Sequence, residues 1–319
     1  MEAIGGYLGL EGLGGRKENV FHKKAIPLNS GRNAFRLILQ CQKIKHIVIP
    51  NYLCDVIVEP IKDLNINYSY YEINADLEVK YLNNIQADSH LLYINYFGLK
   101  SQYVNYLADE KKKLIVDNSQ AFYDRPHPSV ATFYSPRKFF GVPGGGYAYG
   151  ANLGLNAERD TTYNRCQHLL IRADTNAEEG YETYQENEDK FNDRPLKKMA
   201  ALTQQLLSNI DYEEVKKRRV ENYSYLHSKL ERYNNFFDFA RSSYSCPLIY
   251  PFKNKSVSRK DLIGQRIYVP RYWPKCNDGK HCEGKVGSDL ASNLIALPVD
   301  QRYGQDEMEY MVEVIKRYA

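Results

Sequence analysis

Residues 113 to 150 read KLIVDNSQAFYDRPHPSVATFYSPRKFFGVPGGGYAYG, and this stretch decides the fold. Its apolar run LIV ends in Asp117, a pattern typical of a buried parallel strand that carries a carboxylate at its carboxyl end. A second β-rich run at residues 130–134 leads into Ser135 and Lys138, in the spacing Ser-x-x-Lys. We therefore expect two strands of one sheet whose polar side chains meet at the same edge.

The side chains of this stretch suit one particular ligand. Lys138 can form a Schiff base with an aldehyde, which requires a desolvated amine beside an electron sink. Asp117 can keep a pyridine nitrogen protonated, and Gln120 can hydrogen-bond to a ring oxygen. Ser135 can hold a phosphate. Pyridoxal 5′-phosphate carries all of these groups, so the stretch predicts a site for this cofactor, with Lys138 and Asp117 as its catalytic residues.

Each of these residues also has an ordinary structural interpretation. An aspartate at a strand end that is followed by Asn-Ser often caps a helix or forms a turn. A single lysine usually faces solvent, and the glycines at positions 144 to 146 are compatible with a tight turn alone. The ordered combination of these groups favours the cofactor interpretation, which the structural context has to support.

The same stretch resembles the core of the DegT-like sugar aminotransferases, which are fold-type I enzymes dependent on pyridoxal phosphate. In that family a strand-end Asp-x-x-Gln precedes a Ser…Lys…Gly-Gly stretch. The matching residues here are Asp117, Gln120, Ser135, Lys138, Gly145 and Gly146. At Gly144 the family usually carries an acidic residue instead. The resemblance implies an α/β fold with a mostly parallel central sheet covered by helices, and a smaller C-terminal α+β domain.

A polar turn that opens an amphipathic helix lies earlier in the chain, where residues 27–39 read PLNSGRNAFRLIL. The free N–H groups of such a helix start can hold a phosphate. The turn resembles the family's Ser-Gly-Thr-x-Ala turn, which implies contacts to the cofactor phosphate from Gly31, Arg32 and Asn33. Arg32 replaces the usual threonine and can either pair with the phosphate or point to solvent. A plain helix N-cap by Asn29 or Ser30 is the alternative.

Two further site residues are implied by the resemblance alone. The family places an aromatic residue over the cofactor ring, four positions after the proline that corresponds to Pro50. That position is Cys54 here, so we expect the nearby Tyr52 to stack on the ring, with a buried core tyrosine as the alternative. Asn192 lies in a segment that resembles the Asn-x-Arg turn, which reaches the phosphate bound to the partner subunit. This implies a homodimer with shared active sites, although the turn also suits a helix cap.

Strand and helix patterns alternate through the first half of the chain. Strands are expected at residues 46–50, 65–73, 91–98 and 114–117, with helices between them, as in a parallel sheet. The glycine-rich residues 1–16 lack the spacing of a dinucleotide fingerprint and predict an irregular arm that packs on a neighbour. We expect a large cofactor-binding domain at residues 1–210, and a linker helix with a small domain at residues 211–319.

Composition excludes several classes of function. The 43 basic and 39 acidic residues leave a net charge of +4 and form no long basic run, so nucleic acid is not an expected partner. No apolar run or N-terminal signal suggests a membrane or secretion, and a cytoplasmic setting is expected. The six cysteines lack the spacing of a zinc ribbon, and the group of Cys276, His281 and Cys282 is too sparse to predict a metal site.

The resemblance implies a ping-pong transaminase. An amino acid, glutamate by resemblance, gives its amine to the cofactor bound to Lys138, and a keto group on a nucleotide-linked sugar receives it, a reaction of polysaccharide biosynthesis. Relatives that dehydrate sugars carry histidine at this position, so the lysine favours transamination. A different pyridoxal phosphate activity on the same scaffold remains an alternative. A non-catalytic binding or regulatory protein is a second alternative, which Asp117 and Lys138 disfavour.

Overall fold

A computed structural model describes residues 3–9, 21–190, 195–236, 245–274 and 285–319. Within these residues a central sheet has the strand order β2-β8-β7-β6-β5-β3-β4. The strands are β2 (Ile26–Leu28), β3 (His46–Pro50), β4 (Asn67–Tyr71), β5 (His90–Ile94), β6 (Leu114–Asp117), β7 (Ala131–Tyr134) and β8 (Gly146–Tyr149). Strands β3 to β7 run parallel, whereas β8 is antiparallel to both of its neighbours. The predicted mostly parallel sheet is confirmed.

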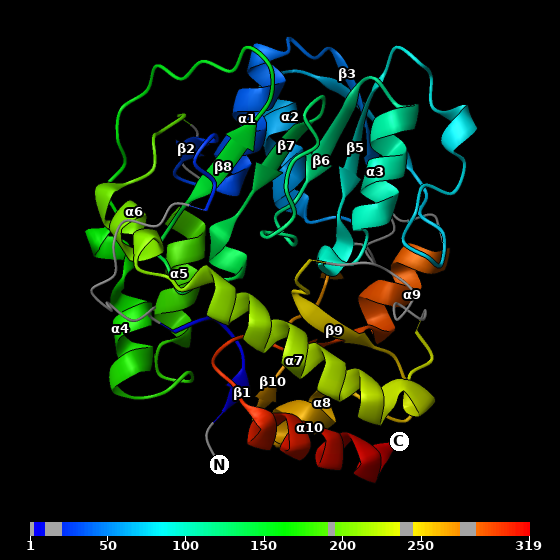
Figure 1. Ribbon diagram of the computed structural model, residues 1–319, viewed down its shortest axis with the longest axis vertical. Coiled ribbons are helices and arrows are strands. Elements are labelled where there is room, and N and C mark those ends of the chain that lie inside the picture. The colour runs from blue at the N-terminus through cyan, green and yellow to red at the C-terminus, as the bar shows by residue number, and fades with distance from the viewer. Residues whose placement is uncertain (1–2, 10–20, 191–194, 237–244, 275–284) are drawn as a thin grey trace.

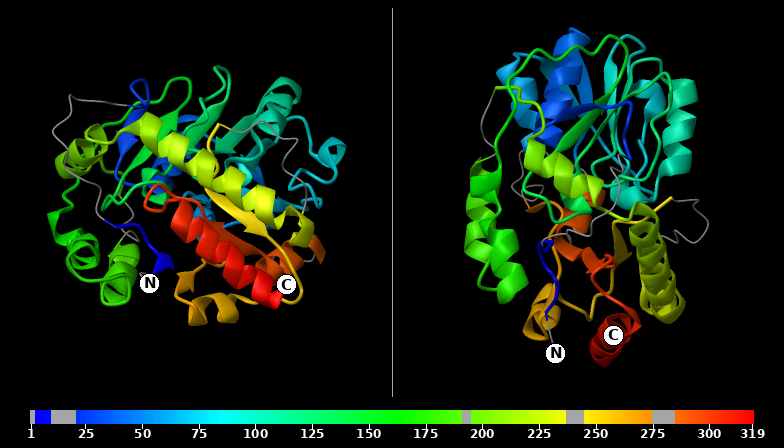
Figure 2. Two further views of the ribbon diagram at one scale, coloured as in Figure 1. Left: turned by 60° about the horizontal axis from the view of Figure 1, so that its bottom comes forward. Right: turned by 60° about the vertical axis from the view of Figure 1, so that its left-hand side comes forward.

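Helices cover both faces of this sheet. Figure 2 shows the sheet between α1 (Gly31–Cys41) and α2 (Val58–Asp63) on one side and α3 (Ser101–Glu110) on the other. The predicted apolar face of α1 is buried, because its side chains at Phe35 and Ile38 are inaccessible to solvent and α1 packs on β7 and β8. The start of α1 is thereby held beside the segment that joins β7 to β8.

The strand expected at residues 91–98 is shorter than the sequence pattern suggests. Strand β5 ends at Ile94, and residues Tyr96–Gly98 form a 3-10 turn instead of continuing the strand. Gly98 has a φ of +71°, and a Cβ there would lie 2.9 Å from the backbone oxygen of Gln120. The chain turns at this point because it passes close to the backbone that follows β6.

The C-terminal half forms a mixed layer below the sheet. Figure 1 shows α7 (Tyr212–Leu230) running beneath the sheet, with α10 (Gln305–Tyr318) packed along it. Strands β9 (Ile249–Phe252) and β11 (Ile295–Pro298) pair antiparallel. The other helices here are α6 (Ala201–Ser208), α8 (Arg259–Gly264) and α9 (Lys285–Asn293). The expected mixture of helices and strands is present, while the division at residue 210 stays a prediction.

The N-terminal segment is not an irregular arm throughout. Strand β1 (Ile4–Gly5) pairs parallel with β10 (Ile267–Tyr268), and the backbone oxygen of Tyr7 accepts hydrogen bonds from Arg172 at 2.5 Å and Arg302 at 2.8 Å. The expectation of irregular structure is wrong for the residues of β1, whereas packing on a neighbour stays a prediction. The residues of β1 pack on their own chain because β10 offers unpaired backbone groups that need partners.

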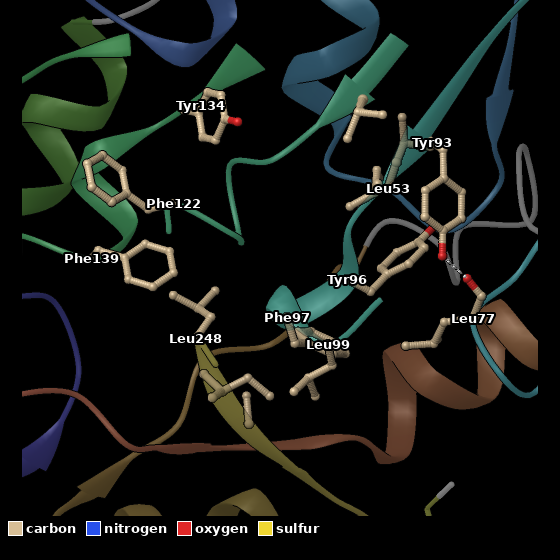
Figure 3. Close-up of a cluster of buried hydrophobic side chains, with 14 of the residues drawn as sticks. Leu53, Leu77, Tyr93, Tyr96, Phe97, Leu99, Phe122, Tyr134, Phe139 and Leu248 are labelled. Atoms are coloured by element: carbon tan, nitrogen blue, oxygen red, sulfur yellow. Dashed lines mark hydrogen bonds between the residues drawn. The ribbon is translucent and has the colours of Figure 1, made fainter. Parts of the chain in front are cut away.

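The hydrophobic core is continuous between the two halves. Figure 3 shows Leu248, just before β9, between Phe139 and Phe97, and the Leu248 amide donates to the Phe97 oxygen at 2.9 Å. Tyr93 in the same figure donates its hydroxyl to the Leu77 oxygen at 2.8 Å. The segment after β7 therefore rests on residues from the far end of the chain. In the ranges described, no helix combines the length and apolar character that spanning a bilayer requires.

Candidate active site

The predicted catalytic residues lie at one edge of the sheet. Asp117 is the last residue of β6, and Ser135 directly follows β7. Because β6 and β7 are neighbours, with Asp117 opposite Phe133, both side chains emerge at the carboxyl ends of adjacent strands. Lys138 closes the 3-10 turn η4 (Pro136–Lys138), and its charge is near enough to Asp117 to affect the carboxyl group. The structure thus brings these three residues together.

Asp117 is held as a buried carboxyl group. It is 5% exposed, and its Oδ1 accepts a hydrogen bond from the backbone N–H of Ser119 at 2.8 Å. Burial raises the pKa of Asp117 to about 6, while the hydrogen bonds from Ser119 and the positive charge of Lys138 act in the opposite direction. The group is largely ionised at neutral pH, so it can oppose a positive charge on a bound ring.

Replacing Asp117 by asparagine is expected to stabilise the ligand-free protein at neutral pH. Its pKa is raised from 3.8 to about 6 on folding, so its stabilising effect is complete below pH 3.8 and is lost as the pH rises through 6. At pH 7 the free energy of unfolding of Asp117→Asn should therefore be roughly 2 to 3 kcal/mol higher than that of wild type, and at pH 4 the two values should be nearly equal. Urea unfolding across this pH range measures the change.

The exposed Asp109 of α3 gives the matched control, and Asp109→Asn should leave the pH dependence unchanged. A stability difference between wild type and Asp117→Asn that does not grow from pH 4 to pH 7 would contradict the argument from burial.

The start of α1 forms the second part of the site, and we call residues 29–32 the Ser30 turn. Ser30 is the N-cap of α1, and its Oγ accepts from the Asn33 amide at 3.1 Å, as the alternative interpretation of this turn expects. A Cβ on Gly31 would lie only 3.1 Å from the Cβ of Ser135 and 3.6 Å from the Oγ of Ser119. Two serines thus approach a helix N-terminus closely, an arrangement that fits a phosphate group.

The glycines after Lys138 allow this close approach. Gly145 has a φ of +118°, and its amide donates to the Asn29 oxygen at 2.6 Å. A Cβ on Gly146 would lie 2.1 Å from the backbone oxygen of Ser30 and 2.7 Å from the amide nitrogen of Gly31. The run is therefore more than a tight turn, because β8 must lie directly against the Ser30 turn.

Replacing Gly146 by alanine is expected to lower the free energy of unfolding by about 3 kcal/mol, since a methyl group would collide with backbone atoms that cannot rotate away. Urea unfolding measures this loss. Gly154→Ala is the matched control, because no atom lies within 4 Å of the added carbon. Equal stability of the two variants would show that β8 and the Ser30 turn are not in close contact.

Arg32 and Asn33 already have partners within the chain. Arg32 forms an ion pair with Glu59 at 2.9 Å and does not point freely to solvent. The side chain of Asn33 donates to Asn29 at 2.8 Å and to the Pro195 oxygen at 3.2 Å. The contacts of Gly31, Arg32 and Asn33 with a phosphate remain predictions.

The predicted ring contacts also lie near the sheet edge. Gln120 is buried, and its Oε1 accepts from the Phe97 amide at 2.8 Å, so its NH2 group is the part that a ring oxygen would meet. Tyr52 is fully buried and donates its hydroxyl to the Tyr272 oxygen at 2.7 Å. Burial raises the pKa of the Cys54 thiol, and the nearby positive charge of Lys138 offsets part of this rise. Stacking by Tyr52 stays a prediction.

Some candidates fall outside the described residues. Asn192 is one of them, and so are the three members of the sparse cysteine and histidine group at positions 276, 281 and 282. Among the residues that the structure does describe, no three His, Cys, Asp or Glu side chains are grouped to hold a metal ion.

The sequence reasoning missed a set of charged residues around Lys138. Arg137, the residue before it, forms an ion pair with Glu188 of α5 (Tyr181–Lys190). The pKa of Arg137 is lowered to about 10, chiefly by burial and in smaller part by the nearby charges of Arg165 and Arg32, against an opposite effect of Tyr184. The only sequence signal was the arginine directly before the lysine.

A second network, of hydrogen bonds that the sequence did not indicate, holds the Ser30 turn in place. Asp160 accepts hydrogen bonds from Asn29 at 3.2 Å and from Arg165 at 2.5 Å. Both Asp160 and Arg165 are buried. These residues lie about 130 positions beyond the turn in the sequence, so no local pattern indicated the contact.

Comparisons with known proteins find similar solved structures, although no protein-family model and no curated protein sequence matches the chain. Spr1654 from Streptococcus pneumoniae, assigned as a sugar aminotransferase, is 15% identical over 98% of this chain and 92% of its own, with a TM-score of 0.68. DesV from S. venezuelae, solved with a ketimine intermediate, is 14% identical over 92% and 84%, with a TM-score of 0.64.

PseC from Helicobacter pylori is a third similar structure, an aminotransferase involved in the biosynthesis of pseudoaminic acid. It is 13% identical over 97% of this chain and 92% of its own, with a TM-score of 0.65. Identities this low establish the likeness of fold. A structure from Brucella abortus among the similar ones is described as a DegT DnrJ EryC1 StrS aminotransferase. This chain therefore has the fold of the sugar aminotransferases of that family, the fold-type I architecture of pyridoxal phosphate enzymes.

Proposed function

We propose that this protein is a pyridoxal phosphate-dependent aminotransferase that acts on a sugar. The observation that carries the proposal is the meeting of Asp117, Lys138 and the Ser30 turn at one edge of the sheet. Each matches one group of the cofactor: the ring nitrogen, the aldehyde and the phosphate. Spr1654, which shares the fold, has been solved in PLP and PMP forms, which supports this choice of cofactor.

The cofactor, when bound, supplies an electron sink for the bonds around the amino carbon. Asp117 opposes the proton on the ring nitrogen, and the Ser119 amide orients the carboxylate for this contact. Ser135 and the N–H groups of the Ser30 turn bind the phosphate. The amine of Lys138 holds the cofactor and, once released, moves a proton to or from the substrate carbon.

The exposed side chain of Lys138 supports an assembly of two subunits. Its side chain is exposed, whereas an amine in this role needs a largely dry environment. A second subunit that covers the sheet edge would provide it, which supports the proposed homodimer with Asn192 reaching the partner's phosphate. We further propose a cytoplasmic enzyme that takes its amine from glutamate. A nucleotide-linked acceptor is supported by the similar fold of DesI, which was solved in the presence of its TDP-sugar product.

Absorbance spectroscopy provides the direct test. Purified protein titrated with pyridoxal 5′-phosphate should develop a band near the visible edge, and borohydride should fix the cofactor covalently to the peptide that contains Lys138, as mass spectrometry would show. In a second sample that is not treated with borohydride, glutamate should bleach the band, and a keto-sugar nucleotide should restore it. Binding without any response to amino donors would favour another activity on this scaffold, and no labelled Lys138 would refute the enzyme proposal.

A further inference from the structure

Arg137 and Glu188 form an ion pair directly beside Lys138. We infer that Arg137 is a ligand of the cofactor phosphate, and that the Glu188 carboxylate occupies its guanidinium until that phosphate binds. This inference rests on the proposed cofactor site. It assigns to α5, which the motifs of the sequence do not mention, a direct part in cofactor binding.

The position of Arg137 supports the assignment. It lies two residues after Ser135, in the short turn that η4 forms at the sheet edge. Ser135 in turn approaches the start of α1, where a Cβ on Gly31 would meet it at 3.1 Å. Arg137 therefore starts from the rim of the phosphate position, and its guanidinium contacts Glu188 of α5.

Arg32, Arg137 and Arg165 each form an ion pair with a carboxylate of the chain. Burial has the largest effect on the pKa of Arg137 and lowers it, and the positive charges of Arg165 and Arg32 also act to lower it. Partly buried cations cost free energy unless anions offset them, and here the carboxylates of the chain do so. A phosphate dianion carries enough charge to offset two of these cations and has the geometry that guanidinium groups bind in pairs.

The internal partners of the three cations differ in how easily they can leave. Asp160, the partner of Arg165, is 5% exposed and is also held by Asn29, so this pair is structural. Glu188, the partner of Arg137, has a side chain that is 41% exposed. A carboxylate at the surface can turn into water at little cost, since exposed ion pairs contribute less than about 1 kcal/mol. Glu188 can therefore give way to a phosphate at little cost in free energy.

The competition can be measured with inorganic phosphate as the probe, by calorimetry at constant ionic strength. Glu188→Gln removes the internal competitor and should tighten phosphate binding about fivefold, whereas Arg137→Gln should weaken it about tenfold. In the double variant the effect of Glu188→Gln should disappear, because its partner is gone. Glu214→Gln and Arg218→Gln are the matched controls. These two residues of α7 have side chains that are 54% and 39% exposed, and they pair with each other at 3.9 Å, away from the site.

Pyridoxal, which lacks the phosphate, is the control ligand that separates this effect from general electrostatics. Glu188→Gln should change the affinity for pyridoxal less than twofold. Unchanged phosphate affinity in Glu188→Gln would overturn the inference, and so would an equal effect in the Glu214→Gln control. If Glu188→Gln instead lowers only the KM for glutamate, Arg137 binds the donor carboxylate and not the phosphate. In each of these cases wild type still develops its cofactor band, whereas failure of the proposed function would abolish that band.

Discussion

Replacing Lys138 by alanine is expected to abolish the covalent attachment of pyridoxal phosphate and to lower turnover by about 10⁴-fold or more. Among the described residues that we assign to the site, Lys138 is the only one with an amine. Its positive charge also acts on the pKa of Asp117. Loss of the amine removes both the attachment point and the group that carries the proton. Borohydride labelling tests the loss of covalent attachment, and the rate of amine transfer from glutamate, measured with excess cofactor, tests the loss of turnover.

The change should leave the fold intact, because the side chain of Lys138 is exposed and its removal creates no cavity. Lys112→Ala, at an exposed lysine in the turn after α3, is the matched control and should retain full activity. Turnover within tenfold of wild type in Lys138→Ala would mean that another group carries the reaction, and the assignment of the site would fail.

Replacing Arg219 by leucine is expected to cause the largest loss of stability, about 3 kcal/mol or more. Arg219 lies on α7 and is 1% exposed. Its guanidinium donates to the Leu248 oxygen at 3.2 Å, to the Phe139 oxygen at 3.2 Å and, through Nε, to Gln301 at 3.1 Å. Leucine cannot replace these bonds, so the buried Leu248 and Phe139 oxygens would each lose their guanidinium donor.

The neighbouring residue provides a close control for this prediction. Arg218 lies on the same helix with a side chain that is 39% exposed, and its contacts with Glu214 and Glu221 are 3.9 and 4.0 Å long. Arg218→Leu should therefore cost less than about 1 kcal/mol. Urea unfolding of both variants gives the comparison. Similar losses for Arg218→Leu and Arg219→Leu would show that the buried hydrogen bonds contribute little.

Arg219 also connects the C-terminal half to the active site. The carbonyl that it binds belongs to Phe139, which directly follows Lys138, and Gln301 donates to the same oxygen at 2.9 Å. The turn that carries the lysine is thus held by residues from α7 and from the segment before α10. Arg219→Lys keeps the charge but cannot reach three acceptors at once, so we expect a loss between those of the other two variants.

Local sequence patterns were enough to predict much of the sheet and the end of the chain. The apolar run before Asp117 and the β-rich run before Ser135 both formed buried strands. The final helix runs from Gln305 to Tyr318, and its side chains at Met308, Val312 and Ile315 recur at helical spacing and are buried. These features depend on side chains a few positions apart, whose periodicity is set by the geometry of one helix or strand.

The tertiary structure alone decided which distant residues complete the site. The ion pair of Arg137 with Glu188, the contact of Asn29 with Asp160 and the pairing of β1 with β10 join segments that no periodic pattern relates. Tyr52 became a fully buried residue bonded to Tyr272 for the same reason. The sequence determined the elements and the chemistry that each strand end carries. Which charges surround that chemistry depends on how the elements pack, because burial and the approach of remote side chains arise only in the folded chain.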